Sequence, residues 1–270
     1  MSSIGSGKTL EQEAREWWKT RIIDIHPGSI RIKGEPIEQL IGNISFPEMI
    51  WRMLRDDSPS RQQAALLEAA LVSAVDHGPQ APSIAIARMS VTCGLGLNGA
   101  MASAINVLDD IHGGAGEQCL TLYQDILDRA SSAELAAAVT AGLTGFREKY
   151  GRIVPGFGHR FHPVDPRAVR LRHLTAIARK EGVVGGRHLA VAEALEQQLK
   201  TSAGKTIPMN IDGATAMIYG ELGFAPELAR GLFILSRSVG ILAHAWEQKQ
   251  QGGRIKGPLP PSLGYTYTGL

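Results

Sequence analysis

The chain has 270 residues, of which 44% are hydrophobic and 20% charged, as is typical of a globular protein with a real core. Its 28 Lys and Arg against 26 Asp and Glu leave a formal charge of +2, which argues against nucleic acid or a membrane surface as partner. The N-terminal residues lack the apolar core of a signal peptide, and no run reaches 18 uncharged apolar residues. We therefore expect a cytoplasmic protein without a membrane span.

The two cysteines, Cys93 and Cys119, form no CxxC motif and no Cys/His cluster. Both lie in stretches rich in Ala and Leu, so we expect free, buried thiols rather than a disulfide framework.

Helical periodicity dominates the chain. Strand-like alternation is confined to residues 30–37, which predict one short hairpin. Helices are expected over 61–76, as a tightly packed pair within 83–108, over 116–130, over 132–150, from 166 to about 179, over 185–203, from 213 onward, and over 226–250. The predicted fold class is therefore all-α.

Local signals support several of these boundaries. His77-Gly78-Pro79 is a helix stop, and Asp165 followed by Pro166 predicts an N-cap with proline in the first helical position. The last helix is apolar almost all round between Leu228 and Trp246, so we expect it to be buried.

Three histidines stand beside glycines where the chain changes direction: His77, His112 and His159. Glycine lets a ligand or a second backbone approach closely, and loop histidines can face a cleft. Each histidine alone is more often structural, but three in such settings favour a site. No metal-ligand spacing surrounds them, so we expect no metal.

Charged residues near these loops indicate an anionic substrate. Arg237 interrupts an apolar helix and must be paired with a carboxylate of the protein or of a ligand. Arg167 follows the His159 loop at a helix start and could bind a carboxylate through two hydrogen bonds. Asp212 precedes a helical pattern, where it serves either as a plain N-cap or as a general base. We predict that residues 155–168 form the active-site loop of an enzyme acting on a carboxylic acid.

Five motifs now stand in a fixed order along the chain. They are His-Gly-Gly-Ala at 112–115, Pro-Gly-Phe-Gly-His-Arg at 155–160 with Asp-Pro-Arg at 165–167, Asn-Ile-Asp at 210–212, Leu-Ser-Arg-Ser-Val-Gly at 235–240 with His244 and Glu247-Gln248, and a tail with Arg254 and a late tyrosine. This set resembles the citrate synthase superfamily over nearly the whole chain, from about Ile30.

The resemblance implies a role for each motif residue. Asp212 would take the α-proton of an acyl-CoA while His112 hydrogen-bonds the thioester oxygen, and His159 would polarise the 2-oxo carbonyl. The residues implied to bind the substrate carboxylates are His77, Arg167, Arg237 and Arg254, the last from the other subunit of a homodimer. Those implied to lie against CoA are Val154, Pro155, Gly156, Phe157 and Gly158.

The resemblance also implies the architecture and the partners. A large helical domain (1–115 and 223–270) would carry a smaller inserted helical domain (116–222), with the active site in the cleft between them. The partners would be an acyl-CoA and oxaloacetate or a related 2-oxo acid. No permanently bound cofactor is expected, with the CoA thioester serving as a substrate.

Two related activities compete. Asp-His-Gly-Pro at 76–79, Asn-Ile-Asp-Gly at 210–213 and the short chain look more like citryl-CoA lyase and the lyase module of ATP-citrate lyase. His-Gly-Gly-Ala at 112–115 is the synthase-like form. We expect a citryl-CoA lyase-like enzyme, with a synthase that condenses and then hydrolyses as the alternative. A non-catalytic binding protein is disfavoured because every motif residue is present.

Overall fold

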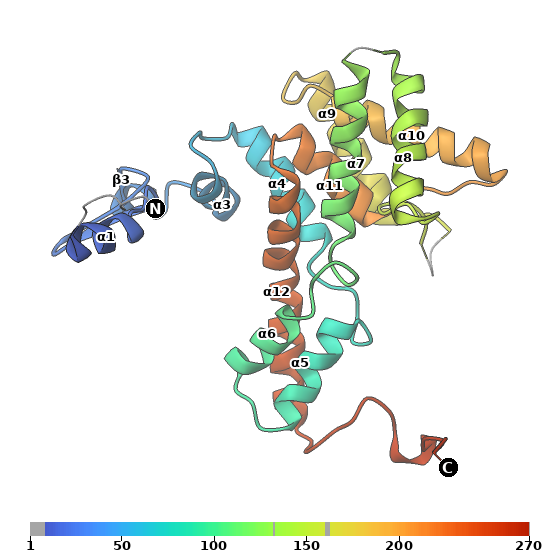
Figure 1. Cartoon of the computed structure of the whole chain (residues 1–270). Helices are drawn as coiled ribbons and strands as arrows, with labels where there is room; N and C mark the ends of the chain where they lie inside the picture. Colours follow the sequence, from blue (N-terminus) through green and yellow to red (C-terminus); the bar gives the residue numbers. More distant parts are fainter. Residues whose placement is uncertain (1–8, 132, 160–162, 270) are drawn as a thin grey trace, which may run out of the picture. The chain divides into compact units, whose positions relative to one another are not determined.

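The computed structural model describes residues 9–131, 133–159 and 163–269, in which helices dominate as predicted (Figure 1). The chain divides into two compact units, Met1–Ala64 and Ala65–Leu270. Each is described here by itself.

The first unit joins short helices to a small antiparallel sheet. Its elements are α1 (Leu10–Trp17), β1 (Ile23–His26), β2 (Ser29–Ile32), β3 (Glu35–Pro36), α2 (Ile37–Leu40) and α3 (Phe46–Leu54). The predicted hairpin is the β2–β3 pair, but β1, which pairs with β2 from Ile23↔Ile32 to His26↔Ser29, was missed. Its four residues are all exposed and give too short an alternation to identify a strand.

Helix α3 supplies most of the small core of this unit. A capping box between Ser45 and Glu48 begins the helix. Ile50 and Trp51 are buried, and the indole Nε1 of Trp51 donates to Asp57 Oδ1 at 2.9 Å. The indole therefore keeps a hydrogen bond although its ring leaves water.

The second unit contains the remaining helices and every predicted site residue. Its elements are α4 (Arg61–Ser73, whose first turn belongs to the first unit), α5 (Pro82–Thr92), α6 (Leu97–Ile105), α7 (Ala115–Ala130), α8 (Leu135–Tyr150), α9 (Pro166–Lys180), α10 (Arg187–Ala203), α11 (Ile211–Glu221), α12 (Pro226–Gln251) and the 3₁₀ turn η1 (Pro261–Leu263). All the predicted helices are present, with ends displaced by a few residues.

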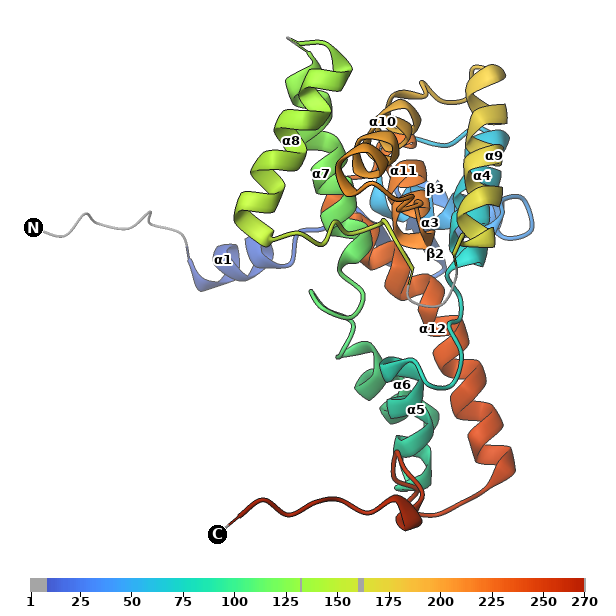
Figure 2. The same cartoon turned by 90° about the vertical axis from the view of Figure 1, so that its right-hand side faces the viewer.

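Helix α12 connects two groups of helices in this unit. Its C-terminal half packs against α5 and α6, and its N-terminal half against α7 and α11 (Figures 1 and 2). The first contact builds a core from Ile84, Ala87, Ala100, Ala104, Ile241 and Ala245, with their neighbours Ala81 and Leu108. Small side chains let these helices approach closely.

The expectation that α12 is buried all round was wrong. Leu235, Val239, Leu242 and Trp246 are between 41% and 59% exposed and form one stripe along the helix. The apolar composition did not reveal which sides would find a neighbour within the chain. By length and composition α12 is also the one helix in the described residues that could cross a membrane, but core helices meet the same criteria.

Helix α11 lies among α7, α9, α10 and α12, and all of its residues from Gly213 to Gly220 are buried. The start of α11 is thereby held in place by several neighbours. The domain boundaries at 115/116 and 222/223 stay a prediction.

The two cysteines differ in their surroundings. Both are free, and Cys119 on α7 is buried as expected, but Cys93 is exposed. Cys93 is the C-cap of α5, where the chain turns at Gly94 with φ of +96°. The expectation of two buried thiols was wrong for Cys93 because helix ends meet solvent more often than helix centres.

Candidate active site

Six of the predicted site residues line one cavity of about 140 Å³. They are His77, His112, His159, Arg167, Asp212 and Arg237, and Ala74, Ile211, Thr215 and Phe233 complete the wall. These residues come from loops and helices of the second unit that are far apart in the sequence. We call this space the central cavity.

The hydrogen bonds of His112 define its tautomer. Its Nε2 accepts the backbone N–H of Ser83 at 3.2 Å and lies 3.1 Å from Ser83 Oγ. A backbone N–H can only donate, so the ring proton resides on Nδ1. Burial, and then the charge of Arg237, lower the pKa of His112. The side chain is therefore a neutral imidazole whose Nδ1–H is a hydrogen-bond donor.

Asp212 is not the N-cap of α11. Asn210 takes that role, because its Oδ1 accepts the backbone N–H groups of Asp212 at 2.9 Å and of Gly213 at 3.3 Å. The carboxylate of Asp212 therefore remains on the wall of the central cavity. Burial raises the pKa of Asp212, although the charges of Arg167 and Arg237 oppose the shift. Of the two roles open to Asp212 in the sequence, capping is taken by its neighbour.

The loop before His159 is hydrogen-bonded to the segment before Asp212. Gly158 N donates to Pro208 O at 2.7 Å, and Asn210 N donates to Gly156 O at 2.9 Å. The Asn210 side chain adds a bond from Nδ2 to Gly158 O at 2.7 Å. The two segments that carry His159 and Asp212 are thus held side by side.

The residues predicted to lie against CoA are partly buried. Val154 and Phe157 are 6% and 8% exposed, so their side chains offer little surface to a ligand. Gly156 has φ of +84°, and a Cβ there would lie 2.5 Å from Cys119 Sγ and 2.8 Å from Gly213 Cα. Only glycine fits this position. The assignment of 154–158 to CoA stays a prediction, and Arg160 of the same motif lies outside the described residues.

Arg167 is held by a buried carboxylate. Asp165, the N-cap of α9, accepts the backbone N–H and the Nε of Arg167 at Oδ1, both at 3.0 Å, and its Nη2 at Oδ2 at 2.9 Å. Burial opposes ionisation, but the hydrogen bonds and charge of Arg167 keep the pKa of Asp165 below its ordinary value. One edge of the guanidinium is therefore occupied, and the edge with Nη1 can serve a substrate carboxylate.

Arg237 is a buried cation without a carboxylate partner in the described part of the chain. It is 5% exposed, its Nε donates to Ala74 O at 3.1 Å, and its guanidinium lies 4.9 Å from the centre of the Phe233 ring. Burial lowers the pKa of Arg237. A ligand carboxylate in the central cavity would supply the missing partner.

His77 and His159 meet edge to face across the cavity, with ring centres 5.9 Å apart. Burial, followed by the charges of Arg167 and Arg237, lowers the pKa of His77. His77 is therefore suited to donate a neutral hydrogen bond to an anion.

Arg254 does not line the central cavity of its own chain. The tail that carries it is bonded to Thr92, with Ile255 N donating to Thr92 O at 2.9 Å. Thr92 is the last residue of α5, whereas Ser83, which contacts His112, lies in its first turn. An 11-residue helix spans about 16 Å, so Arg254 belongs to a different region of the chain.

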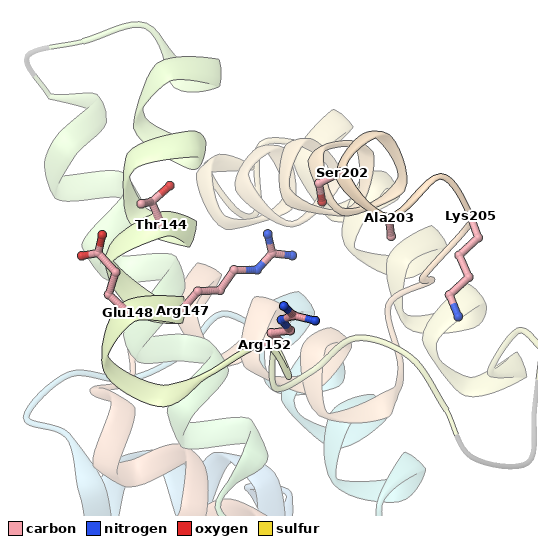
Figure 3. A pocket seen from close by; sticks show the side chains of 7 residues that line it. All are labelled: Thr144, Arg147, Glu148, Arg152, Ser202, Ala203 and Lys205. Atoms are coloured by element: carbon pink, nitrogen blue, oxygen red, sulfur yellow. The ribbon is translucent and has the colours of Figure 1, made fainter.

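A larger cavity of about 890 Å³ opens between α8 and α10 (Figure 3). It is lined by Thr144, Arg147, Glu148, Arg152, Ser202, Ala203 and Lys205. We call it the basic cavity. Arg147 and Arg152 extend into it (Figure 3), and the buried Nε of Arg147 has no hydrogen-bond partner in the part of the chain described.

Sequence reasoning missed several contributors to these sites. Asn210, two residues before Asp212, had a usable signal because asparagine at a helix start is a strong cap. Arg152 stands two residues before Val154 and could have drawn attention to the basic cavity. Ser83 had no signal, since its bond to His112 joins positions 29 residues apart.

Comparison with known proteins identifies the family of the chain. The family described as citrate synthase, C-terminal domain, matches residues 29–258. A citrate synthase of Deinococcus radiodurans is 31% identical over 79% of the chain, which spans 54% of that relative's length.

Solved structures share the fold over more of the chain. That of citryl-CoA lyase from Hydrogenobacter thermophilus is 31% identical and covers 94% of this chain and 95% of its own, with a TM-score of 0.82. ATP citrate lyase from Methanothrix soehngenii, at 20% identity, covers the whole chain and 46% of its own, with a TM-score of 0.75, a likeness of fold. Motifs, fold and relatives agree, and the chain belongs to the citrate synthase family.

Proposed function

We propose that this protein is a citryl-CoA lyase-type enzyme that cleaves citryl-CoA reversibly to acetyl-CoA and oxaloacetate. One observation carries the proposal: a neutral histidine donor, a buried carboxyl group and two arginines line the same small cavity. The 31% identity to a citryl-CoA lyase, over nearly all of both chains, supports it.

The substrate carboxylates would bind to the cationic side of the central cavity. The guanidinium of Arg237 would bind one carboxylate, and the Nη1 edge of Arg167 would bind another. His77 would donate a neutral hydrogen bond. Each pair is charge-assisted and shielded from water, so oxaloacetate would be oriented as well as bound.

Cleavage then requires two proton transfers. His159 takes the proton of the citryl hydroxyl, the oxygen becomes the carbonyl of oxaloacetate, and the carbon–carbon bond breaks toward the thioester. The electron pair forms an enolate whose oxygen accepts the Nδ1–H of His112. Asp212 protonates the enolate carbon to give acetyl-CoA, and the proton on His159 returns to Asp212 through solvent. Condensation is the reverse, with Asp212 as general base.

The environment of Asp212 suits both cleavage and condensation. Cleavage needs its carboxyl group protonated, and burial raises its pKa toward that state. Condensation needs the carboxylate, which Arg167 and Arg237 favour. The same residue can thus serve both directions, as a reversible enzyme requires.

The CoA moiety would extend from the central cavity along residues 154–158. Arg152 connects this loop to the basic cavity, whose cations Arg147, Arg152 and Lys205 suit phosphate groups. We assign this cavity to the phosphates of CoA. No permanently bound cofactor enters the scheme.

A homodimer would complete the site. Arg254 lies away from the central cavity of its own chain, so a second copy is the proposed source of this carboxylate ligand. The exposed stripe of Leu235, Val239, Leu242 and Trp246 on α12 offers an apolar surface for that copy. Closure of a domain of residues 116–222 over the substrate would exclude water.

The second candidate is a citrate synthase, in which water hydrolyses the thioester after condensation. It is favoured by relatives such as the citrate synthase of Deinococcus radiodurans. Supplying citryl-CoA and following acetyl-CoA and free CoA separates the two. Acetyl-CoA formed without free CoA supports the lyase, and free CoA released together with citrate supports the synthase. Neither product from a folded protein, over a panel of acyl-CoAs and 2-oxo acids, would reject both.

A further inference from the structure

One arginine of α12 binds three carboxylates that flank the His112 loop. Arg230 pairs with Asp109, with Asp110 Oδ1 from Nη2 at 2.5 Å, and with Glu117 Oε2 from Nε at 2.6 Å. The acceptors stand three and two residues before His112 and five residues after it. The side chains of Arg230 and Glu117 are only 20% and 25% exposed, so this pair is partly shielded from water, whereas Asp109 and Asp110 are 79% and 75% exposed.

The loop is held at its base rather than at its tip, and the Gln118 side chain donates there to Asp110 O at 3.0 Å. Ile111 is fully exposed, and Gly113 has φ of +118°. A backbone β-bridge between Asp109 and Gly113 brings the two ends of the loop together, and Gly114 packs directly on the backbone of Asp110. The ring of His112 is bonded only to Ser83 among the contacts the structure describes. Its position therefore depends on how the two ends of the loop are fixed.

Arg230 also connects the His112 loop to the helix that carries Arg237. It precedes Arg237 by seven residues, or two helical turns, so both project from nearly the same side of α12. One rigid helix thus bonds both ends of the His112 loop and presents the guanidinium that faces the central cavity.

We propose that Arg230 is a positioning residue, which sets the distance of the His112 donor from the carboxylate site built on Arg237. The inference rests on the proposed function. Arg230 does not line the central cavity and touches no reacting atom; it acts through the loop. Its loss would displace the donor that stabilises the enolate and leave the carboxylate site intact.

The test compares Arg230→Met with Arg88→Met. Arg88 is the control because its side chain is 18% exposed and it ties α5 to α12 through Glu247, Gln251 and His244, whose Nδ1 lies 3.3 Å from Arg88 Nη1. For Arg230→Met we expect kcat for citryl-CoA cleavage to fall by about 10²-fold, as for a misplacement on the order of 1 Å. The oxaloacetate dissociation constant, measured by calorimetry, should stay at the wild-type value. Arg230→Lys should recover part of kcat.

A second readout needs no turnover. In ¹⁵N-histidine spectra assigned with His112→Gln, the wild type should show an Nδ1–H imidazole, and Arg230→Met should shift or broaden that signal. Arg88→Met should leave it unchanged. This readout remains informative if the wild type cleaves no citryl-CoA, an outcome that would reject the proposed function alone.

Two results would overturn the inference. One is an Arg230→Met protein with wild-type kcat and an unchanged His112 signal. The other is an equal loss of kcat and oxaloacetate affinity in both arginine variants, which would indicate general packing. If Arg230→Met does not fold, Glu117→Gln and Asp110→Asn each remove one pair and are judged by the same two measurements.

Discussion

The buried carboxylate of Asp165 binds the guanidinium of Arg167 through both of its oxygens. Its Oδ2 also accepts the backbone N–H of Ile211 at 3.1 Å, one residue before Asp212. A single side chain thus connects a proposed substrate ligand with the start of the helix that carries the proposed acid.

Asp165→Asn should lower both stability and substrate affinity. The amide keeps the shape but removes the charge, and one of its ends would present a donor to existing donors. We expect a loss of about 2 kcal/mol in the free energy of unfolding, measured in urea, and weaker oxaloacetate binding. Asp125→Asn, which breaks the exposed pair with Arg129 on α7, is the control and should change neither. Unaltered oxaloacetate affinity in Asp165→Asn would contradict the proposed role of Arg167.

Asp212→Asn should abolish carbon–carbon chemistry in both directions, because an amide can neither give nor take the α-proton. Oxaloacetate should still bind, since Arg167 and Arg237 remain. Rapid-quench measurement of acetyl-CoA and calorimetry with oxaloacetate test the two statements separately. Turnover at the wild-type rate would remove Asp212 from the mechanism.

The two directions should depend on pH with opposite sign. Burial raises the pKa of Asp212, so its acid form persists above the ordinary range of a carboxyl group. Condensation needs the ionised form, and its kcat should rise as the pH rises through that pKa. Cleavage needs the protonated form, and its kcat should fall over the same range. If kcat for cleavage and kcat for condensation changed in the same direction with pH, a group other than Asp212 would be the one titrated.

Gly156→Ala should destabilise the protein more than Gly151→Ala. Both glycines have positive φ, +84° and +90°, so each variant incurs backbone strain. Only at Gly156 would the new Cβ meet Cys119 Sγ and the backbone of Gly213. We expect an additional loss of about 1–3 kcal/mol in the free energy of unfolding. An equal loss of unfolding free energy in the two variants would mean that the loop moves to accommodate the new Cβ at position 156 without loss of stability.

Arg152→Met should raise KM for citryl-CoA and leave oxaloacetate affinity unchanged. The change removes a cation from the basic cavity without touching the central one. Arg170→Met, at an exposed position on α9 that lines neither cavity, is the control. The effect of Arg152→Met should shrink at high salt, because screening weakens phosphate contacts. An unchanged KM for every CoA thioester would place the CoA phosphates elsewhere.

The sequence by itself determined which segments are helical and which residues are candidates for the chemistry. Helical period, caps and stops are local properties, so the start of α9 at Asp165 and Pro166 followed from neighbouring residues. The ordered motifs likewise identified His112, His159 and Asp212 as candidates before any fold was known.

Only the tertiary structure decided how these residues meet. His112 owes its tautomer to Ser83, which is distant in sequence, and Asp212 is available for chemistry because Asn210 caps the helix instead. The exposed stripe of α12 could not be predicted from the sequence either, since apolar composition does not specify which side of a helix packs against a neighbour. Contacts between distant segments depend on how helices pack, and packing is a property of the whole chain that no local pattern encodes.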